Sequence, residues 1–307
     1  MLKNHAIKKN KTNIYMYIMM APGLLYLLIN NYIPMAGIFI AFKSLNYAKG
    51  IFKSDWVGLR NFEFLFHTSD AFVMTRNTLL YNIAFIVIGN VLGIILAIFL
   101  NDIVSRKLAS VYQTVLLLPS LVSMVIVSYL VYAFLSSDSG YFNKTLLPML
   151  GIDEISWYST PKFWPFILII VNEWRNVGFS AIIYLSSVVG IDKSYYESAM
   201  IDGASKWKQI KTITLPLIKP TVIILVLMSI GTIFYSDFGL FYQVPLNSGM
   251  LFSVTNTLDT YVFRGLMQQN NIAMSSAAGV YQSLVGFILV ILANFIVRKF
   301  DSENSLF

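Results

Sequence analysis

Six long apolar stretches limit what this chain can fold into, because each is long enough to cross a lipid bilayer. They cover residues 15–42, 78–100, 111–135, 164–189, 221–242 and 281–297. A hydrocarbon core about 30 Å thick needs roughly 20 helical residues. The stretches are apolar on every face, whereas a transmembrane barrel shows alternating polarity in segments of about ten residues. The sequence therefore predicts an all-α, polytopic membrane protein with six transmembrane helices.

Composition agrees with a membrane protein and argues against other classes. Hydrophobic residues make up 57% of the chain and charged residues 12%, which is more apolar surface than one core can bury. With no cysteine and two distant histidines, the sequence offers no thiolate or histidine-rich metal site, and we expect no cofactor on this chain. The net charge of +7 does not indicate nucleic acid here, because the placement of cations matters more than their sum in a membrane protein.

The first stretch resembles a signal peptide at its start, because four lysines precede the apolar run. The run continues past Pro22 and Pro34 to Phe42, which is too long for a signal sequence, and no small-x-small cleavage site closes it. We expect it to remain in the mature protein as a kinked first span.

The distribution of lysine and arginine predicts that both termini are cytoplasmic. With that orientation, 13 of the 22 cations lie on the inner side and eight on the outer side, although the outer loops are much longer. The remaining cation, Arg175, falls within the fourth span. The segment 190–220 is then the only long cytoplasmic loop, and the natural place to contact a cytoplasmic partner.

That loop carries the signals of a helix, a sharp turn and a second helix. Ser194 followed by Glu197 has the spacing of a capping box, which predicts a helix over residues 195–202. Gly203 permits the positive φ that ends such a helix. A second helix is expected from about residue 204, with apolar residues at 207, 210 and 213, until Pro216 stops it. The element suits docking into a groove of another protein, or an interfacial position on anionic lipid headgroups.

The order of residues in this loop resembles the EAA loop of bacterial ABC-importer permeases, which lies before the penultimate span. The matching residues are Glu197, Ala199, Asp202, Gly203, Ala204, Ile213, Leu215 and Pro216. Ser198 stands where the family usually has a second alanine. The version with Asp-Gly-Ala and Leu-Pro is similar to permeases for sugars and oligosaccharides, and residues 241–245 and 258–264 look like the subgroup for complex oligosaccharides or polysaccharide fragments.

The resemblance implies a transport subunit of a bacterial cell (inner) membrane, and not an enzyme. Its partners would be a homologous second permease, two ATP-binding-cassette ATPase subunits and an extracellular solute-binding protein, with an oligosaccharide as substrate. The chain has no G-x-x-x-x-G-K-[ST] loop, so ATP and Mg would bind the ATPase subunits. Residues 1–14 would form a basic cytoplasmic N-terminus and residues 15–307 the permease domain, with a core six-helix region at about 78–297.

Polar residues inside the fourth and fifth spans are candidates for a substrate pathway. They are Asn172, Glu173, Arg175, Tyr235, Asp237 and Tyr242. Sugars need polar groups for their hydroxyls and aromatic faces for their C–H surfaces, and this set supplies both. The alternative is structural, since charged residues at membrane depth often pair with a neighbouring helix or a partner subunit.

Three other polar features have structural interpretations. Asn82 and Asn90 are expected to form hydrogen bonds between helices, and Gly89 and Gly93 form a small-xxx-small pair that permits close helix packing. The adjacent carboxylates at 153 and 154 resemble a hydrolase pair, but neighbouring residues point apart, so a solvated turn is expected.

Two alternative functions remain at this point. An integral-membrane enzyme, such as a lipid-linked glycosyltransferase, should show acidic clusters or histidines at a membrane face, and the strongest such feature is residues 153–154. A secondary transporter that works alone is disfavoured, because six spans without an evident internal repeat suit a half-transporter better.

Overall fold

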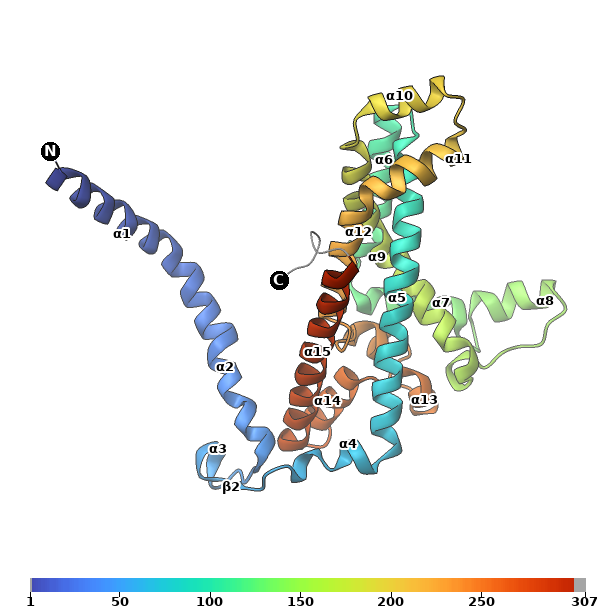
Figure 1. Ribbon diagram of the computed structural model, residues 1–307. Helices are drawn as coiled ribbons and strands as arrows, with labels where there is room; N and C mark the ends of the chain where they lie inside the picture. Colours follow the sequence, from blue (N-terminus) through green and yellow to red (C-terminus); the bar gives the residue numbers. More distant parts are fainter. Residues whose placement is uncertain (1, 301–307) are drawn as a thin grey trace.

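The computed structural model describes residues 2–300 and is a bundle of long helices with short connecting elements (Figure 1). Met1 and residues 301–307, the end of the expected permease domain, lie outside the described residues. The α-helices are α1 (Leu2–Leu27), α2 (Ile33–Met35), α3 (Gly50–Lys53), α4 (Phe64–His67), α5 (Ser69–Asn101), α6 (Arg106–Leu121), α7 (Met124–Leu135), α8 (Leu147–Met149), α9 (Trp164–Val189), α10 (Lys193–Ile201), α11 (Lys206–Gln209), α12 (Leu215–Gly231), α13 (Phe252–Thr255), α14 (Leu258–Met267) and α15 (Ile272–Phe300).

Short 3₁₀ and π segments connect or extend these helices. The 3₁₀ segments are η2 (Ala36–Phe42), η3 (Arg60–Phe62), η5 (Trp157–Ser159), η6 (Pro161–Phe163) and η9 (Gly249–Leu251). The π segments are η1 (Leu28–Tyr32), η4 (Phe142–Leu146), η7 (Ile210–Thr214) and η8 (Gly239–Gln243). Strands β1 (Lys43–Ser44) and β2 (Asp55–Trp56) pair antiparallel, with Lys43 opposite Trp56. The all-α prediction is confirmed apart from this small ribbon.

The membrane spans follow the predicted pattern, with two corrections. Five helical segments of the described chain are long and apolar enough to span a membrane. The predicted third span, 111–135, is broken into α6 and α7 at an angle of 94°, because Ser123 caps a new helix two residues after the first one ends. The predicted fifth span ends at Gly231 and not at residue 242. It also begins earlier, since Lys206–Gly231 is one helical segment.

Each π segment ends two residues before a proline. The prolines are Pro34, Pro148, Pro216 and Pro245. A proline ring clashes with the carbonyl four residues earlier and has no N–H to donate. The wider π turn accommodates the ring; before Pro216, for example, the Leu215 N–H donates to the Ile210 oxygen five residues back. Pro216 therefore does not stop the helix, as the sequence predicted, and the chain continues from α11 through η7 into α12.

The bundle is centred on α5 and α9, which pack along each other. A Cβ at Gly89 would lie 2.9 Å from the Glu173 carboxylate, and one at Gly93 would lie 3.1 Å from the Ser180 Cβ. Both glycines therefore face α9, which confirms the predicted small-xxx-small contact. Around this pair, Tyr81, Leu168, Val171, Leu240 and Phe241 form the largest buried apolar cluster.

The first span stands apart from the bundle (Figure 1). Nearly all side chains between Ile14 and Met35 are exposed, including apolar ones such as Met19. The helix passes through Pro22 and curves before it reaches the bundle at η2. A long apolar helix without contacts leaves its surface to lipid or to another subunit.

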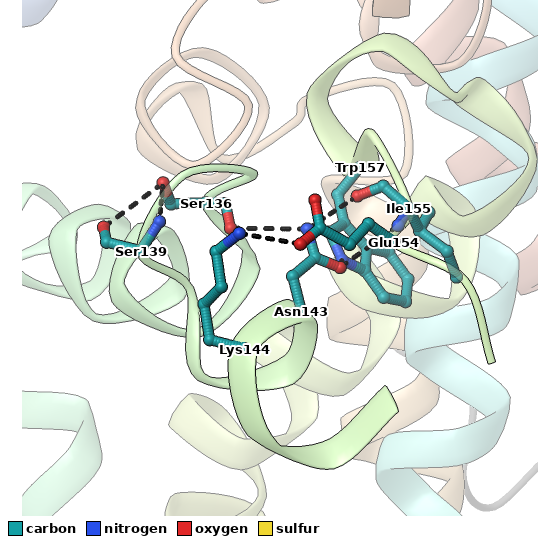
Figure 2. A network of polar contacts seen from close by, with 7 residues as sticks. All are labelled: Ser136, Ser139, Asn143, Lys144, Glu154, Ile155 and Trp157. Atoms are coloured by element: carbon teal, nitrogen blue, oxygen red, sulfur yellow. Dashed lines mark hydrogen bonds and ion pairs between the residues drawn. The ribbon is translucent and has the colours of Figure 1, made fainter. Parts of the chain in front are cut away.

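The connection between α7 and α9 is ordered by one buried asparagine (Figure 2). The Asn143 amide donates to the Ile155 carbonyl at 2.9 Å, and its oxygen accepts from the indole of Trp157 at 3.1 Å. On the surface, Lys144 pairs with Glu154 at 2.7 Å. Glu154 is thus an exposed member of a turn, as predicted for residues 153–154, and it pairs with a lysine and not with a second acid.

Candidate functional site

Helix α10 begins at a different cap from the one the sequence indicated. Asp192 precedes the helix, and its carboxylate accepts a hydrogen bond from the Ser194 N–H at 2.9 Å. The predicted capping box of Ser194 and Glu197 is therefore wrong, because the helix starts two residues earlier than predicted, at Lys193. The bond from the Ser194 backbone holds the pKa of the Asp192 carboxyl below its ordinary value.

The turn after α10 is the one that Gly203 predicted. Gly203 has φ +73°, and its N–H donates to the Met200 oxygen at 3.0 Å. The Ala204 N–H donates to the Ala199 oxygen at 2.8 Å. These two bonds form a Schellman motif, in which a left-handed residue closes the helix end. Ser205 then caps α11 by accepting from the Lys208 N–H, so the corner is built entirely from local bonds.

The corner from α10 to α11 is exposed at one end of the bundle (Figure 1). Of the motif residues on it, Glu197, Ser198 and Asp202 are exposed, while Ala199 and Ala204 are half-buried. The motif residues Ile213, Leu215 and Pro216 lie beyond it, in the helix of η7 and α12. Apolar side chains also face outward here, with Ile201 88% and Trp207 71% exposed. These side chains are available for contact with another molecule or with lipid headgroups.

Two contacts attach this corner to the bundle. The Lys206 ammonium lies 2.9 Å from the Asp102 carboxylate in the hairpin between α5 and α6, and the Tyr196 hydroxyl lies 2.9 Å from that of Thr214. Sequence reasoning missed Asp102, although it is the one acidic residue in the short inner loop from 101 to 110.

A second feature, within the bundle, is a polar cavity of about 480 Å³ between α5, α9 and α12. Its polar lining is amides and hydroxyls: Asn82, Asn90, Asn172, Asn176, Ser180, Ser229 and Thr232. The rest of the wall is apolar and includes two aromatic rings, Phe85 and Phe179, beside Ile86, Gly89, Ile183, Leu225 and Met228. This arrangement offers hydrogen bonds and flat apolar faces to the same ligand. We call it the amide cavity.

Of the predicted pathway residues, Asn172 lines the amide cavity. Its oxygen accepts from the Asn176 amide at 3.1 Å, and its own amide donates to Glu173 at 3.1 Å. Glu173 is buried, and its carboxylate lies against Gly89. The carboxylate therefore supports the orientation of Asn172 from behind the cavity wall.

Arg175 and Asp237 form an ion pair outside the cavity lining. The Arg175 guanidinium lies 3.2 Å from the Asp237 carboxylate. The other Asp237 oxygen accepts from the Leu240 N–H at 3.1 Å, so this side chain also caps the start of η8. The pair joins α9 to the segment that follows α12. This pairing agrees with the structural alternative to a substrate pathway, in which charged residues at membrane depth pair with a neighbouring segment.

The two predicted tyrosines lie elsewhere. The Tyr235 hydroxyl is 3.2 Å from that of Ser283, and its ring lines a cavity against α15. The Tyr242 ring stacks on Phe238, with 4.8 Å between ring centroids, and contacts Phe263 edge-on. Tyr235, Asp237 and Tyr242 therefore have separate partners and do not form one site. The helix ends at Gly231, so helical spacing does not apply to them.

Asn90 forms a contact between helices, as the sequence predicted, whereas Asn82 binds the non-helical segment that follows α12. The Asn82 amide donates to the carbonyls of Ile233 and Tyr235, both at 2.9 Å. Asn90 accepts a hydrogen bond from the Tyr184 hydroxyl of α9. The other lining residues were missed, although Asn172, Asn176 and Ser180 recur every four residues and form a polar stripe on an apolar helix.

A multi-pass helical bundle with an exposed helix-turn-helix at one end and a polar cavity inside has the architecture of a membrane transport subunit. The chain belongs to the family of binding-protein-dependent transport system inner membrane components, whose model matches residues 89–302. This confirms the predicted ABC-importer permease and its place in the inner membrane. The sidedness of the termini remains a prediction.

Relatives and solved structures support the same assignment. Protein LplB of Bacillus subtilis (strain 168) is 34% identical over 97% of this chain and 92% of its own. The polygalacturonan/rhamnogalacturonan transport system permease protein YteP of the same organism is 34% identical over 94% of this chain and 89% of its own. A chain of a bacterial ABC transporter involved in import of the acidic polysaccharide alginate has a TM-score of 0.87 and 30% identity, and the match covers 97% of this chain and 99% of that one.

Proposed function

We propose that this chain is a permease subunit of an ATP-driven importer for oligosaccharides released from polysaccharides. It works with a homologous second permease, two ATPase subunits that bind ATP and Mg, and an extracellular solute-binding protein. The observation that carries the proposal is the exposed corner of α10 and α11, in a chain 34% identical to a polygalacturonan/rhamnogalacturonan permease. A structural neighbour was crystallised with an alginate pentasaccharide-bound periplasmic protein, which supports an oligosaccharide as the transported form.

The corner is the site that contacts an ATPase subunit. It presents Ile201 and Trp207 outward, while its turn is closed by its own backbone bonds. Such an element can enter a groove and move without unfolding. Because α11 continues through η7 into α12, and α9 leads into α10, a displacement of the corner reaches the walls of the amide cavity as a rigid-body motion.

The amide cavity is the part of the pathway that this subunit supplies. Asn172 and Asn176 offer donors and acceptors to sugar hydroxyls, and Phe85 and Phe179 offer faces to sugar C–H groups. We assign Glu173 and the pair of Arg175 with Asp237 to the support of this wall, since they lie beside the cavity and not in its lining.

The orientation proposal places both termini and the corner on the cytoplasmic side. The start of α1 and the end of α15 lie toward the end of the bundle that carries α10, which supports it (Figure 1). Residues 1–14 then form a basic inner segment, as expected from the lysines that precede the first span.

Reconstitution tests the proposal directly. The chain is placed in liposomes with its partner subunits and binding protein, and ATP hydrolysis is measured with galacturonan, rhamnogalacturonan and alginate oligosaccharides. We expect at least one of these to stimulate hydrolysis, and Asn172→Leu to abolish uptake while basal hydrolysis persists. Asn30→Leu, on the exposed first span, is the control. An equal rate of ATP hydrolysis with and without saccharide would contradict the proposal.

A crosslinking experiment tests the ATPase contact separately. The chain has no cysteine, so a single cysteine at Ser198 gives a clean background. We expect it to crosslink to a cysteine in the ATPase groove, and a cysteine at Ser105 in the other inner loop to crosslink far less. A higher crosslinking yield at Ser105 than at Ser198 would contradict the proposal, because it would place the ATPase contact in the other inner loop.

A further inference from the structure

The segment between the first span and α5 builds a rigid wall against α15. The Asn61 amide donates to the carbonyls of Ala41 and Lys43, both at 2.9 Å, and so attaches η3 to the end of the first span. The ring of Phe42 stacks on Trp56 at 5.6 Å and contacts Phe62 at 5.3 Å. The wall is therefore preformed by hydrogen bonds and ring contacts, at the end of the bundle opposite α10 (Figure 1).

Between this wall and α15 lies an apolar cavity of about 450 Å³. Aromatic and aliphatic side chains line it, among them Phe42, Phe62, Phe66, Tyr281 and Leu284. Phe42 is the last residue of the first span, whereas Leu284 lies well inside the span Ile272–Lys299. The cavity therefore runs from the edge of the bilayer inward. Most of its lining is apolar, and its charged side chain, Glu63, also lines the neighbouring polar cavity, so a lipid chain is a suitable occupant.

A polar cavity of the same volume, about 450 Å³, adjoins the apolar one. The two share Glu63 in their linings, and the polar cavity adds Arg60, Asn61, Asn271 and Ser44. Among the described residues, neither Arg60 nor Glu63 is in an ion pair. Two adjoining cavities of opposite polarity, with one cation and one anion in the polar part, match an amphiphile with a zwitterionic headgroup.

We propose that these joined cavities bind one zwitterionic phospholipid from the surrounding bilayer. An acyl chain fills the apolar cavity beside Leu284, the headgroup phosphate meets Arg60, and the headgroup ammonium meets Glu63. The site lies where the first span joins the bundle, so the bound lipid fills the joint between them. With the proposed orientation, this is a lipid of the outer leaflet. The lipid site itself does not depend on the transported substrate.

Native mass spectrometry of the full chain tests this proposal. The protein is extracted from membranes, delipidated in detergent and supplied with phosphatidylethanolamine or phosphatidylglycerol. Leu284→Trp fills the apolar cavity, and Leu292→Trp is the matched control, on the same helix, similarly exposed and lining none of the cavities described here. We expect wild type and Leu292→Trp to retain one phosphatidylethanolamine, and Leu284→Trp to lose it.

A second variant examines the headgroup and does not depend on the folding of Leu284→Trp. Arg60→Gln removes a charge-assisted bond to phosphate and should weaken retention about tenfold. Equal retention by Arg60→Gln and wild type would overturn the proposal. A preference for phosphatidylglycerol would also overturn it, as would loss of the lipid whenever the second permease is present, since that subunit would then occupy the cavity.

Discussion

The chain leaves helical geometry at two places, one before and one after α12. The backbone N–H and C=O groups find their hydrogen-bond partners in different ways at these two places. At the corner after α10, the free N–H and C=O groups pair with each other around Gly203. After Gly231, the break over residues 232–237 relies on distant side chains: Asn82 binds two carbonyls, Gln282 binds the Phe234 carbonyl at 2.6 Å, and Asp259 accepts from the Ser236 N–H at 2.6 Å.

The difference concerns how each region can move. A turn closed by local bonds keeps its shape when it is displaced, so the corner suits a contact that is pushed by another subunit. A break held by residues from α5, α14 and α15 keeps its shape only while those elements stay in place. Function should therefore be most sensitive to the corner, and stability most sensitive to the break.

The largest effect is expected from a substitution that disrupts the corner between α10 and α11. Proline fixes φ near −65°, so Gly203→Pro cannot adopt the observed +73° and also loses the bond to Met200. We expect transport to be abolished while the amount of protein in the membrane stays close to that of wild type. Both quantities are measured in the same cells.

Gly151 provides the matched control for that change. It has φ +68°, and its N–H donates to the Pro148 oxygen in the connection between α7 and α9. Gly151→Pro makes the same backbone error far from the corner, and we expect it to transport. If both variants fail alike, the loss reflects misfolding and not coupling.

The next largest effect is expected from a substitution that destabilises the break over residues 232–237. Gln282 is buried and donates to the Phe234 carbonyl and to Asp259, so Gln282→Leu removes the donor to a buried carbonyl, at a cost of about 1–3 kcal/mol, while Asp259 keeps its bonds from Ser236. Thermal unfolding in detergent measures it. Gln268→Leu, at an exposed site, should stay within about 0.5 kcal/mol of wild type. An unchanged unfolding temperature in Gln282→Leu would show that these contacts do not stabilise the break.

A smaller effect is expected at the ion pair that joins α9 to the break. Asp237→Asn keeps the shape but removes the charge opposite Arg175, and partly exposed pairs contribute about 1 kcal/mol. We expect a modest loss of stability and a smaller loss of uptake than for Asn172→Leu. Abolished uptake at unchanged stability would instead place Asp237 in the pathway.

The smallest effect is a pH dependence at the start of α10. The pKa of Asp192 is held below its ordinary value of 3.8, so the cap stabilises the helix above that value. The stabilisation is lost as the pH falls below 3.8, when the carboxylate is protonated. Hydrogen exchange at the start of α10, corrected for intrinsic rates, should show this loss in wild type. Asp192→Asn should show the same protection at every pH.

The same division explains what the sequence could predict. The corner follows from local chemistry, so Gly203 and the motif around it were sufficient to predict a helix, a turn and a second helix. The error at its start is also local, since Asp192 and Ser194 are both good caps and only the structure shows which one the backbone uses. Long apolar runs predicted the spans, because length and hydropathy are properties of one segment.

The break and the amide cavity depend on residues that only the fold brings together. Apolar residues continue on both sides of Asp237, with Ile233 and Phe234 before it and Leu240 and Phe241 after it, so hydropathy extended the fifth span through the break. The 94° bend between α6 and α7 was hidden for the same reason. The cavity draws its amides from α5 and α9 and its hydroxyls from α9 and α12. No single segment carries that pattern, although the stripe on α9 was visible.

The π turn before Pro216 has a geometric consequence for the motif. One extra residue in a helical turn rotates everything that follows by about 100°. The Leu-Pro pair therefore fixes the rotation between the exposed end of the helix, at Trp207, and the cavity end, at Ser229 and Thr232. A change that let this turn relax to regular α geometry would rotate every side chain of α12 toward a different neighbour and also shift it along the axis by about 1.5 Å. The position of Pro216 thus determines how the two ends of this helix are rotated relative to each other.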